Sequence, residues 1–227
     1  MAQSDGEKWV SNHYLANKGV EYFNWQGGVG GGMGKIEARK FQRFISSGDD
    51  VLDFGCGGGY LLEALNCRSK AGVEVNPAAV RECQLRDLKV TDHIATVPNA
   101  SFDVVLSNHS LEHTQSPFTS LKEIFRILRP NGKMVAHTPI DDWRSYRSYS
   151  ESDIHHHLYT WTPQNFGNLL SDVGFKIERI SLLTYCLPPY AAHLYPLLPE
   201  PLFDLVCRMW GTLIRYRQIE TIASKPG

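Results

Sequence analysis

The stretch that decides the fold is Val51-Leu52-Asp53-Phe54-Gly55-Cys56-Gly57-Gly58-Gly59. Four residues with strand propensity lead into a glycine turn, and residues 60–65 follow with a helical pattern. A strand, a glycine loop and a helix in this order form the cofactor corner of a doubly wound α/β sheet. The dinucleotide fingerprint Gly-x-Gly-x-x-Gly fails because Tyr60 occupies its third glycine position. Since Asp53 would repel a pyrophosphate and attract an amino group, the loop favours a cationic cofactor without phosphate.

Three further motifs follow the glycine loop in order. They are Gly72-Val73-Glu74-Val75-Asn76, Ser101-Phe102-Asp103-Val104-Val105 and Leu128-Arg129-Pro130-Asn131-Gly132-Lys133. Together with the glycine loop they resemble the class I S-adenosylmethionine-dependent methyltransferases, and the resemblance runs from about residue 41 to 225. It implies S-adenosylmethionine as the cofactor. The implied fold is α/β, a Rossmann-like doubly wound seven-stranded sheet that is mostly parallel with an antiparallel last strand.

The resemblance also implies which residues hold the cofactor. Glu74 would accept hydrogen bonds from the ribose hydroxyls, and Asp53 would bind the amino-acid end. Asp92, after a third strand expected within residues 89–94, would reach the adenine amino group; a solvent-exposed turn residue is the equal alternative. The full predicted set is Asp53, Gly55, Cys56, Gly57, Glu74, Val75, Asp92 and Asn108.

Length and composition restrict the class of protein. The 227 residues suit one α/β domain with its own core. Five cysteines without a Cys-x-x-Cys pair, in a chain that starts polar and without a signal peptide, predict a reduced, cytoplasmic protein. A formal net charge of −1 argues against nucleic acid as a partner. No apolar run approaches the roughly 20 residues that a transmembrane helix needs.

Two segments stand outside the sheet pattern. Residues 1–40 would form an N-terminal cap, and residues 41–227 the methyltransferase domain. Six of the eight residues 27–34 are glycine, which predicts a mobile loop because each glycine loses much conformational entropy on folding. In the resembled family this segment often closes over the cofactor. The segment has two interpretations, a lid and a plain connector, and its aromatic residues slightly favour the lid.

The second segment is a helical insertion at residues 187–215, which begins rich in proline. Leu202, Leu205, Met209 and Leu213 then recur at helical spacing and form an apolar stripe. We expect the stripe to pack against a protein surface, most simply over the mouth of this domain's own active site. A homodimer face and a weak membrane-surface contact are the alternatives, since the stripe ends in the basic residues Arg215 and Arg217.

The chemistry-bearing stretch is Asn108-His109-Ser110-Leu111-Glu112-His113, after the expected fourth strand. A helical turn would place its two histidines and its glutamate on one face. A later stretch, His155-His156-His157, precedes an aromatic-x-Trp-Thr element, and adjacent histidines point in different directions. We predict His113 as the acid/base or ligand residue, assisted by Glu112, with the acceptor pocket completed by His109 and His157. His137, inside the fifth strand, is expected to be a hydrogen-bonded core residue.

The same pattern is similar to ubiquinone-pathway O-methyltransferases and small-RNA 2′-O-methyltransferases, which carry Glu-x-x-Glu-His and bind a divalent ion there. Here His109 replaces the first glutamate, so magnesium fits poorly and a transition metal fits better. Glycan and natural-product methyltransferases show Leu-Glu-His without a known metal. Binding of a divalent metal is therefore an alternative that is not favoured.

The expected function is methyl transfer from S-adenosylmethionine to an oxygen, or with less support a nitrogen, of a small or glycan-linked metabolite. One alternative is an RNA 2′-O-methyltransferase, which the lack of basic composition disfavours. The other is a catalytically idle methyltransferase-like subunit that binds a partner through the residue 202–215 helix. An idle domain would not need the intact glycine loop together with Glu74 and His113, so the enzyme is preferred.

Overall fold

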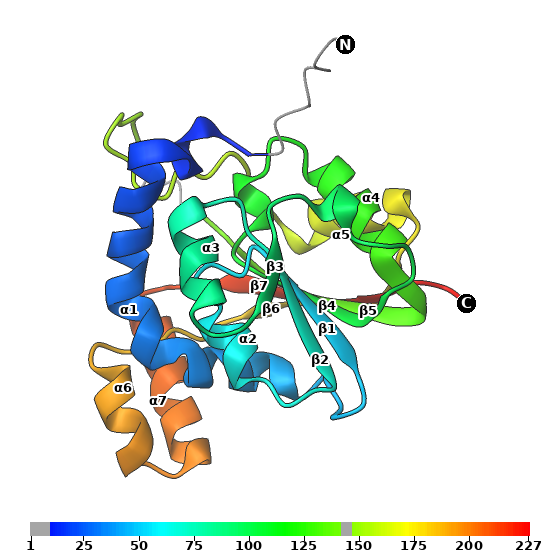
Figure 1. Cartoon of the computed structure of the whole chain (residues 1–227). Helices are drawn as coiled ribbons and strands as arrows, with labels where there is room; N and C mark the ends of the chain where they lie inside the picture. Colours follow the sequence, from blue (N-terminus) through cyan, green and yellow to red (C-terminus); the bar gives the residue numbers. More distant parts are fainter. Residues whose placement is uncertain (1–9, 142–146) are drawn as a thin grey trace.

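The computed structural model describes residues 10–141 and 147–227. Its centre is a seven-stranded sheet with the strand order β3-β2-β1-β4-β5-β7-β6 (Figure 1). Strand β7 is antiparallel to its neighbours β5 and β6, and the other pairings are parallel. The predicted sheet is thereby confirmed. The strands are β1 (Asp50–Phe54), β2 (Ser69–Val73), β3 (Lys89–Thr91), β4 (Phe102–Asn108), β5 (Leu128–Pro139), β6 (Lys176–Leu183) and β7 (Gln218–Ser224).

The helices begin where the sequence places caps. Asn76, Ser116 and Thr162 each accept a backbone N–H with the side chain, and each is followed by a proline in the first helical turn. The α-helices are α1 (Ala16–Gln42), α2 (Tyr60–Ala64), α3 (Pro77–Gln84), α4 (Pro117–Ile127), α5 (Pro163–Val173), α6 (Ala191–Leu194) and α7 (Glu200–Leu213). Short 3₁₀ helices are η1 (Asn12–Tyr14), η2 (Ile94–Thr96), η3 (Leu111–His113) and η4 (Tyr195–Leu197).

Helices cover both faces of the sheet, as Figure 1 shows. On one face α4 and α5 contribute Ile124, Phe166 and Leu170 to the larger apolar core. On the other face Phe41 of α1 and Leu62 of α2 pack against the strands in a second core. None of the described helices has the length and the apolar character needed to span a bilayer.

The predicted mobile loop at residues 27–34 is wrong, because α1 continues through all of them. Gly34 packs so closely on the start of α2 that a Cβ atom there would lie 2.5 Å from the Tyr60 carbonyl oxygen. Close packing of α1 on the domain therefore decides a conformation that the glycine content alone opposes. The first nine residues of the expected cap, and residues 142–146, lie outside the described part of the chain.

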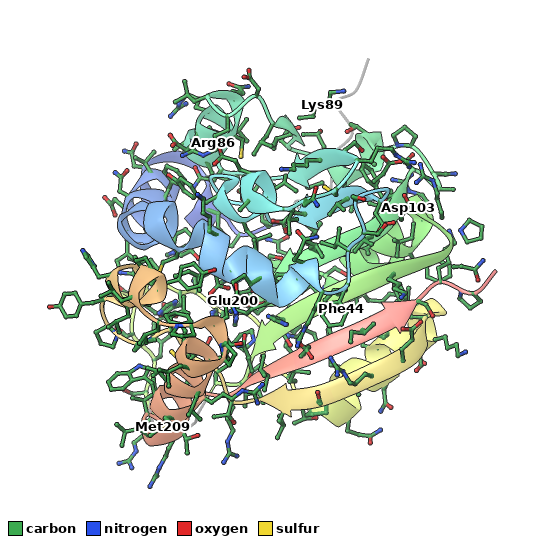
Figure 2. The ribbon with its side chains drawn as sticks, turned by 90° about the horizontal axis from the view of Figure 1, so that it is seen from below. Phe44, Arg86, Lys89, Asp103, Glu200 and Met209 are labelled. Carbon is green, nitrogen blue, oxygen red and sulfur yellow. The ribbon has the colours of Figure 1, made fainter. Side chains whose placement is uncertain are left out.

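The expectation that the residue 202–213 stripe packs on this chain's own surface is also wrong. Helix α7 instead buries Phe203, Cys207 and Gly211, which pack near Ile36 and Tyr185. Leu202, Leu205, Met209 and Leu213 are exposed. Figure 2 shows Met209 on the outer side of α7, away from the sheet.

Candidate active site

The glycine loop after β1 turns through three left-handed residues. Gly55, Gly57 and Gly59 have φ angles of +80°, +52° and +77°, which favour glycine. At Gly55 a Cβ atom would lie 2.4 Å from the Ser110 side chain, so the loop also needs the missing side chain for space. The loop therefore turns tightly at the carboxyl edge of the sheet, where open α/β sheets bind ligands.

Glu74 follows β2 and braces the glycine loop. Its Oε2 accepts the backbone N–H of Gly57 at 2.8 Å, and its Oε1 accepts that of Asn76 at 2.8 Å. Burial raises the pKa of Glu74, and these backbone hydrogen bonds oppose the shift. The carboxylate is thus held at the strand end, the position that the sequence analysis assigned to ribose binding.

Two adjoining cavities meet at this edge. The first, of about 110 Å³, is lined by Tyr14, Tyr22 and Phe23 from the N-terminal segment and by the predicted residues Gly55, Gly57, Glu74, Val75, Asp92, Asn108, His109 and His113. The second, of about 760 Å³, shares Gly55, Gly57 and Asn108 and adds Asp53 and Cys56. Its far side is formed by residues 187–193 and Trp210. The predicted cofactor residues thus lie along one continuous edge.

Asp53 is the buried acid of the glycine-loop strand. Its side chain is 2% exposed, and within residues 10–141 and 147–227 its Oδ1 atom has no hydrogen-bond partner. Burial, and then the nearby charge of Glu74, raise the pKa of Asp53 to about 7. A cationic group bound here would stabilise the ionised carboxylate, which suits the amino group of an amino-acid cofactor end.

We expect Asp53→Asn to stabilise the ligand-free protein at pH 8. Because the folded pKa of about 7 lies above the ordinary aspartate pKa of 3.8, the folded state binds this proton more tightly than the unfolded state, and stability is lost as the pH rises from 4 to 7. Asparagine at this position removes that loss in the free energy of unfolding, which is on the order of 2–4 kcal/mol. Urea unfolding at pH 8 and pH 4 measures the free energy of unfolding, and Asp172→Asn, at an exposed position, is the control. An equal effect at both pH values would contradict the assigned shift.

Tyr14 was missed as a site residue, although it lies in the aromatic N-terminal segment. Its hydroxyl lies 2.6 Å from His113 Nδ1 and 2.6 Å from the His155 carbonyl oxygen. Because that carbonyl can only accept, Tyr14 donates to it and accepts the Nδ1–H of His113. The Nε2 atom of His113 then carries the lone pair. Burial lowers the pKa of His113 to about 4, so its imidazole is neutral at physiological pH.

Glu112 lies beside this imidazole and is fully buried. Its Oε1 atom is 3.6 Å from His109 Nδ1 and 4.0 Å from His113 Nε2. Neither carboxylate oxygen has a hydrogen-bond partner among the described residues. The two histidines and Glu112 are brought together, but not on one helical face: η3 starts at Leu111, and His109 has a φ angle of +53°.

His157, from the later His155-His156-His157 stretch, lies close to Glu112 and His113. Asp141 holds its Nδ1 at 3.0 Å and raises the pKa of His157, against the effect of burial. One donor atom from each of Glu112, His113 and His157 lies within 4.8 Å of the others, an arrangement that fits a divalent transition metal ion. These three residues would hold such an ion, which would polarise an acceptor hydroxyl.

The remaining histidines of the later stretch serve other contacts. His156 stacks on His13, with ring centroids 4.5 Å apart, and His155 meets the edge of Trp25. His137 is fully buried and lies 3.3 Å from Glu220 through its Nε2 atom, as expected for a core histidine. Of the triple histidine, His157 is therefore the member that joins Glu112 and His113 in the possible metal group.

Comparison with known proteins identifies the family of the chain. Residues 34–180 match the methyltransferase domain family. A Pseudomonas fluorescens protein named ubiquinone biosynthesis O-methyltransferase is 31% identical over 70% of this chain and 77% of its own length. A Bradyrhizobium diazoefficiens protein of the same name is 33% identical over 48% of this chain, and the match spans only about half of that protein.

Solved structures agree on the fold. A Haloferax volcanii putative methyltransferase, in complex with the Trm112 methyltransferase activator, has a TM-score of 0.66 at 21% identity and covers 91% of this chain and 98% of its own. A Thermotoga maritima protein described as a SAM-dependent methyltransferase has a TM-score of 0.62 at 15% identity, covering 95% and 98%. The chain belongs to the methyltransferase domain family, in its class I, S-adenosylmethionine-dependent form.

Proposed function

We propose that this protein transfers the methyl group of S-adenosylmethionine to a hydroxyl oxygen of a small or glycan-linked metabolite. The observation that carries the proposal is His113, a neutral imidazole whose ring lines the same cavity as Glu74, Gly57 and Asn108. An alkyl hydroxyl is a poor nucleophile unless its proton is removed as it attacks. A neutral imidazole with a free Nε2 lone pair can accept that proton.

In the proposed reaction the acceptor oxygen attacks the methyl carbon, and the carbon–sulfur bond breaks in line with the attack. S-adenosylhomocysteine leaves with the bonding electron pair, and the hydroxyl proton passes to Nε2 of His113. The enzyme contributes mainly alignment and exclusion of water. Glu112 stabilises the imidazolium that forms, since its charge raises the pKa of His113 against the effect of burial.

The position of the N-terminal segment supports the proposal that this segment closes over the methyl donor. Tyr14, Tyr22 and Phe23 line the first cavity, and Asn76 Nδ2 donates to the Gly19 carbonyl of α1 at 2.7 Å. Residues 1–40 would thus act as a cap, although α1 crosses residue 40 without a break. Because Tyr14 also holds His113, closing the cap and orienting the base would be one event.

Oxygen is preferred as the acceptor atom because the curated relatives named above are called O-methyltransferases. RNA is disfavoured by the net charge of −1. An idle, partner-binding domain is disfavoured because both cavities are formed and Asp53 Oδ1 has no hydrogen-bond partner among the described residues. These observations support an enzyme acting on a metabolite.

The test is incubation of a metabolite extract with the protein and methyl-labelled S-adenosylmethionine, followed by mass spectrometry. We expect label in one metabolite class, as a methyl ether formed on a hydroxyl group. A parallel incubation with His113→Ala controls for contaminating enzymes. Label found only in RNA, or only on nitrogen, would contradict the proposal, as would no label in a preparation that binds the cofactor.

A further inference from the structure

Helix α7 presents an apolar stripe that the domain does not cover. The stripe consists of Leu202, Leu205, Met209 and Leu213, and Leu205, Met209 and Leu213 are 51%, 63% and 73% exposed. The opposite side of the same helix is already packed through Phe203 and Cys207. Large apolar residues gathered on one exposed face are typical of an interaction site.

The charges on α7 are divided between its two sides. The acids Glu200 and Asp204 lie 3.4 and 3.5 Å from Arg39 of α1, whose single positive charge offsets part of theirs. Arg208, which flanks the stripe, and Arg215 and Arg217 beyond its end are exposed. Over residues 10–141 and 147–227 no ion pair involves any of these three arginines. The outward side is therefore apolar with unneutralised positive charge.

We propose that the α7 stripe docks on an anionic membrane surface, with Leu205, Met209 and Leu213 in the interface and the arginines at the lipid headgroups. An exposed apolar helix face flanked by arginine binds membranes through both the buried apolar area and attraction to anionic lipid. This reverses the sequence-based expectation that the stripe packs against a protein surface. The exposed arginines supply the charge complementarity.

A second copy of the chain fits the stripe less well. A two-fold interface brings the same patch of both protomers together, so pairing through Met209 would bring two copies of Arg208 near each other. The acids that would relieve their repulsion are turned to Arg39 instead. A lipid surface with negative headgroups matches the same charge without that penalty.

The docked helix would also form part of the acceptor site. Trp210 of α7 and residues 187–193 line the second cavity opposite Asp53 and Gly57. This step rests on the proposed function: an acceptor with an apolar chain, held in the same bilayer, would be the substrate class that benefits from docking. The docking itself needs no acceptor, so the test below can fail while the methyltransferase assignment stands.

The test is flotation of the full chain with vesicles of phosphatidylcholine alone or with phosphatidylglycerol added. We expect co-flotation with the anionic vesicles and much weaker binding to the neutral ones. Raising salt from 0.1 M to 1 M should weaken it, since the Debye length falls from about 10 Å to about 3 Å. The double variant Leu205→Asp, Met209→Asp should reduce binding about tenfold or more, because two apolar contacts become charged.

Matched variants separate docking from misfolding. Leu85→Asp makes the same change at a leucine that is 80% exposed at the end of α3, and we expect it to float like the unmodified protein. Arg208→Glu should weaken binding to anionic vesicles, whereas Arg81→Glu, at an exposed position of α3, should not. Absence of co-flotation, or a dimer in sedimentation that the Leu205→Asp, Met209→Asp variant dissociates, would overturn the proposal.

Discussion

Replacing His113 with alanine is expected to lower turnover by about 10²–10⁴-fold while affinity for S-adenosylmethionine changes little. The loss reflects removal of the proton acceptor, the usual size of a general-base contribution. The ring is well placed because Tyr14 holds its Nδ1 atom, and it is neutral because burial lowers its pKa to about 4. Initial rates with the identified acceptor, and calorimetric titration of the cofactor, measure the two effects separately.

The same variant distinguishes a plain base from a metal ligand. If Glu112, His113 and His157 hold a divalent ion, a chelator should abolish activity, added metal should restore it, and His157→Ala should be nearly as damaging as His113→Ala. If His113 acts alone, a chelator should leave activity intact, and His157→Ala should be milder. Full activity in both single variants would show that this cluster is structural and that the enzyme works by alignment.

Replacing Glu74 with alanine is expected to weaken S-adenosylmethionine binding by roughly 1–3 kcal/mol, about 5- to 150-fold. The variant loses the proposed hydrogen bonds to the ribose hydroxyls. It also loses the carboxylate that accepts the N–H groups of Gly57 and Asn76, so the glycine loop becomes less fixed. Isothermal titration calorimetry is the measurement.

The matched control is Glu178→Ala, which removes an exposed glutamate on β6 at the far edge of the sheet. It should bind the cofactor as the unmodified protein does. Unchanged affinity in both Glu74→Ala and Asp53→Asn would contradict the assignment of S-adenosylmethionine binding to the glycine loop, because that assignment depends on these two acids. A loss in Glu178→Ala of similar size would point to a general effect on folding.

The sheet and the glycine loop after β1 were predictable from sequence because they are encoded locally. The glycines at 55, 57 and 59 are required where the backbone turns left-handed, and caps such as Asn76 and Thr162 mark helix starts. Parallel strands bring their carboxyl ends to one edge. Local motifs in the right order therefore define where the acids Asp53 and Glu74 meet.

Contacts between segments far apart in the chain decided the features that local sequence patterns did not predict. The glycine-rich residues 27–34 are helical because α1 packs on α2 at Gly34, a close approach that no local pattern reveals. The partnership of Tyr14 with His113 joins residues 99 positions apart. Helix α7 is apolar on two sides, and periodicity alone does not show which side the domain buries.

The sequence by itself thus determined the class of fold, the strand ends that carry Asp53 and Glu74, and the identity of the histidine and glutamate after the fourth strand. Only the tertiary structure decided that His113 is neutral and held by Tyr14, that Glu112 is buried without a hydrogen-bond partner among the described residues, and that the α7 stripe faces outward. The physical reason is that backbone turns and caps depend on neighbours in sequence. Burial, which sets pKa values and exposed surface, depends on packing between segments far apart in the chain.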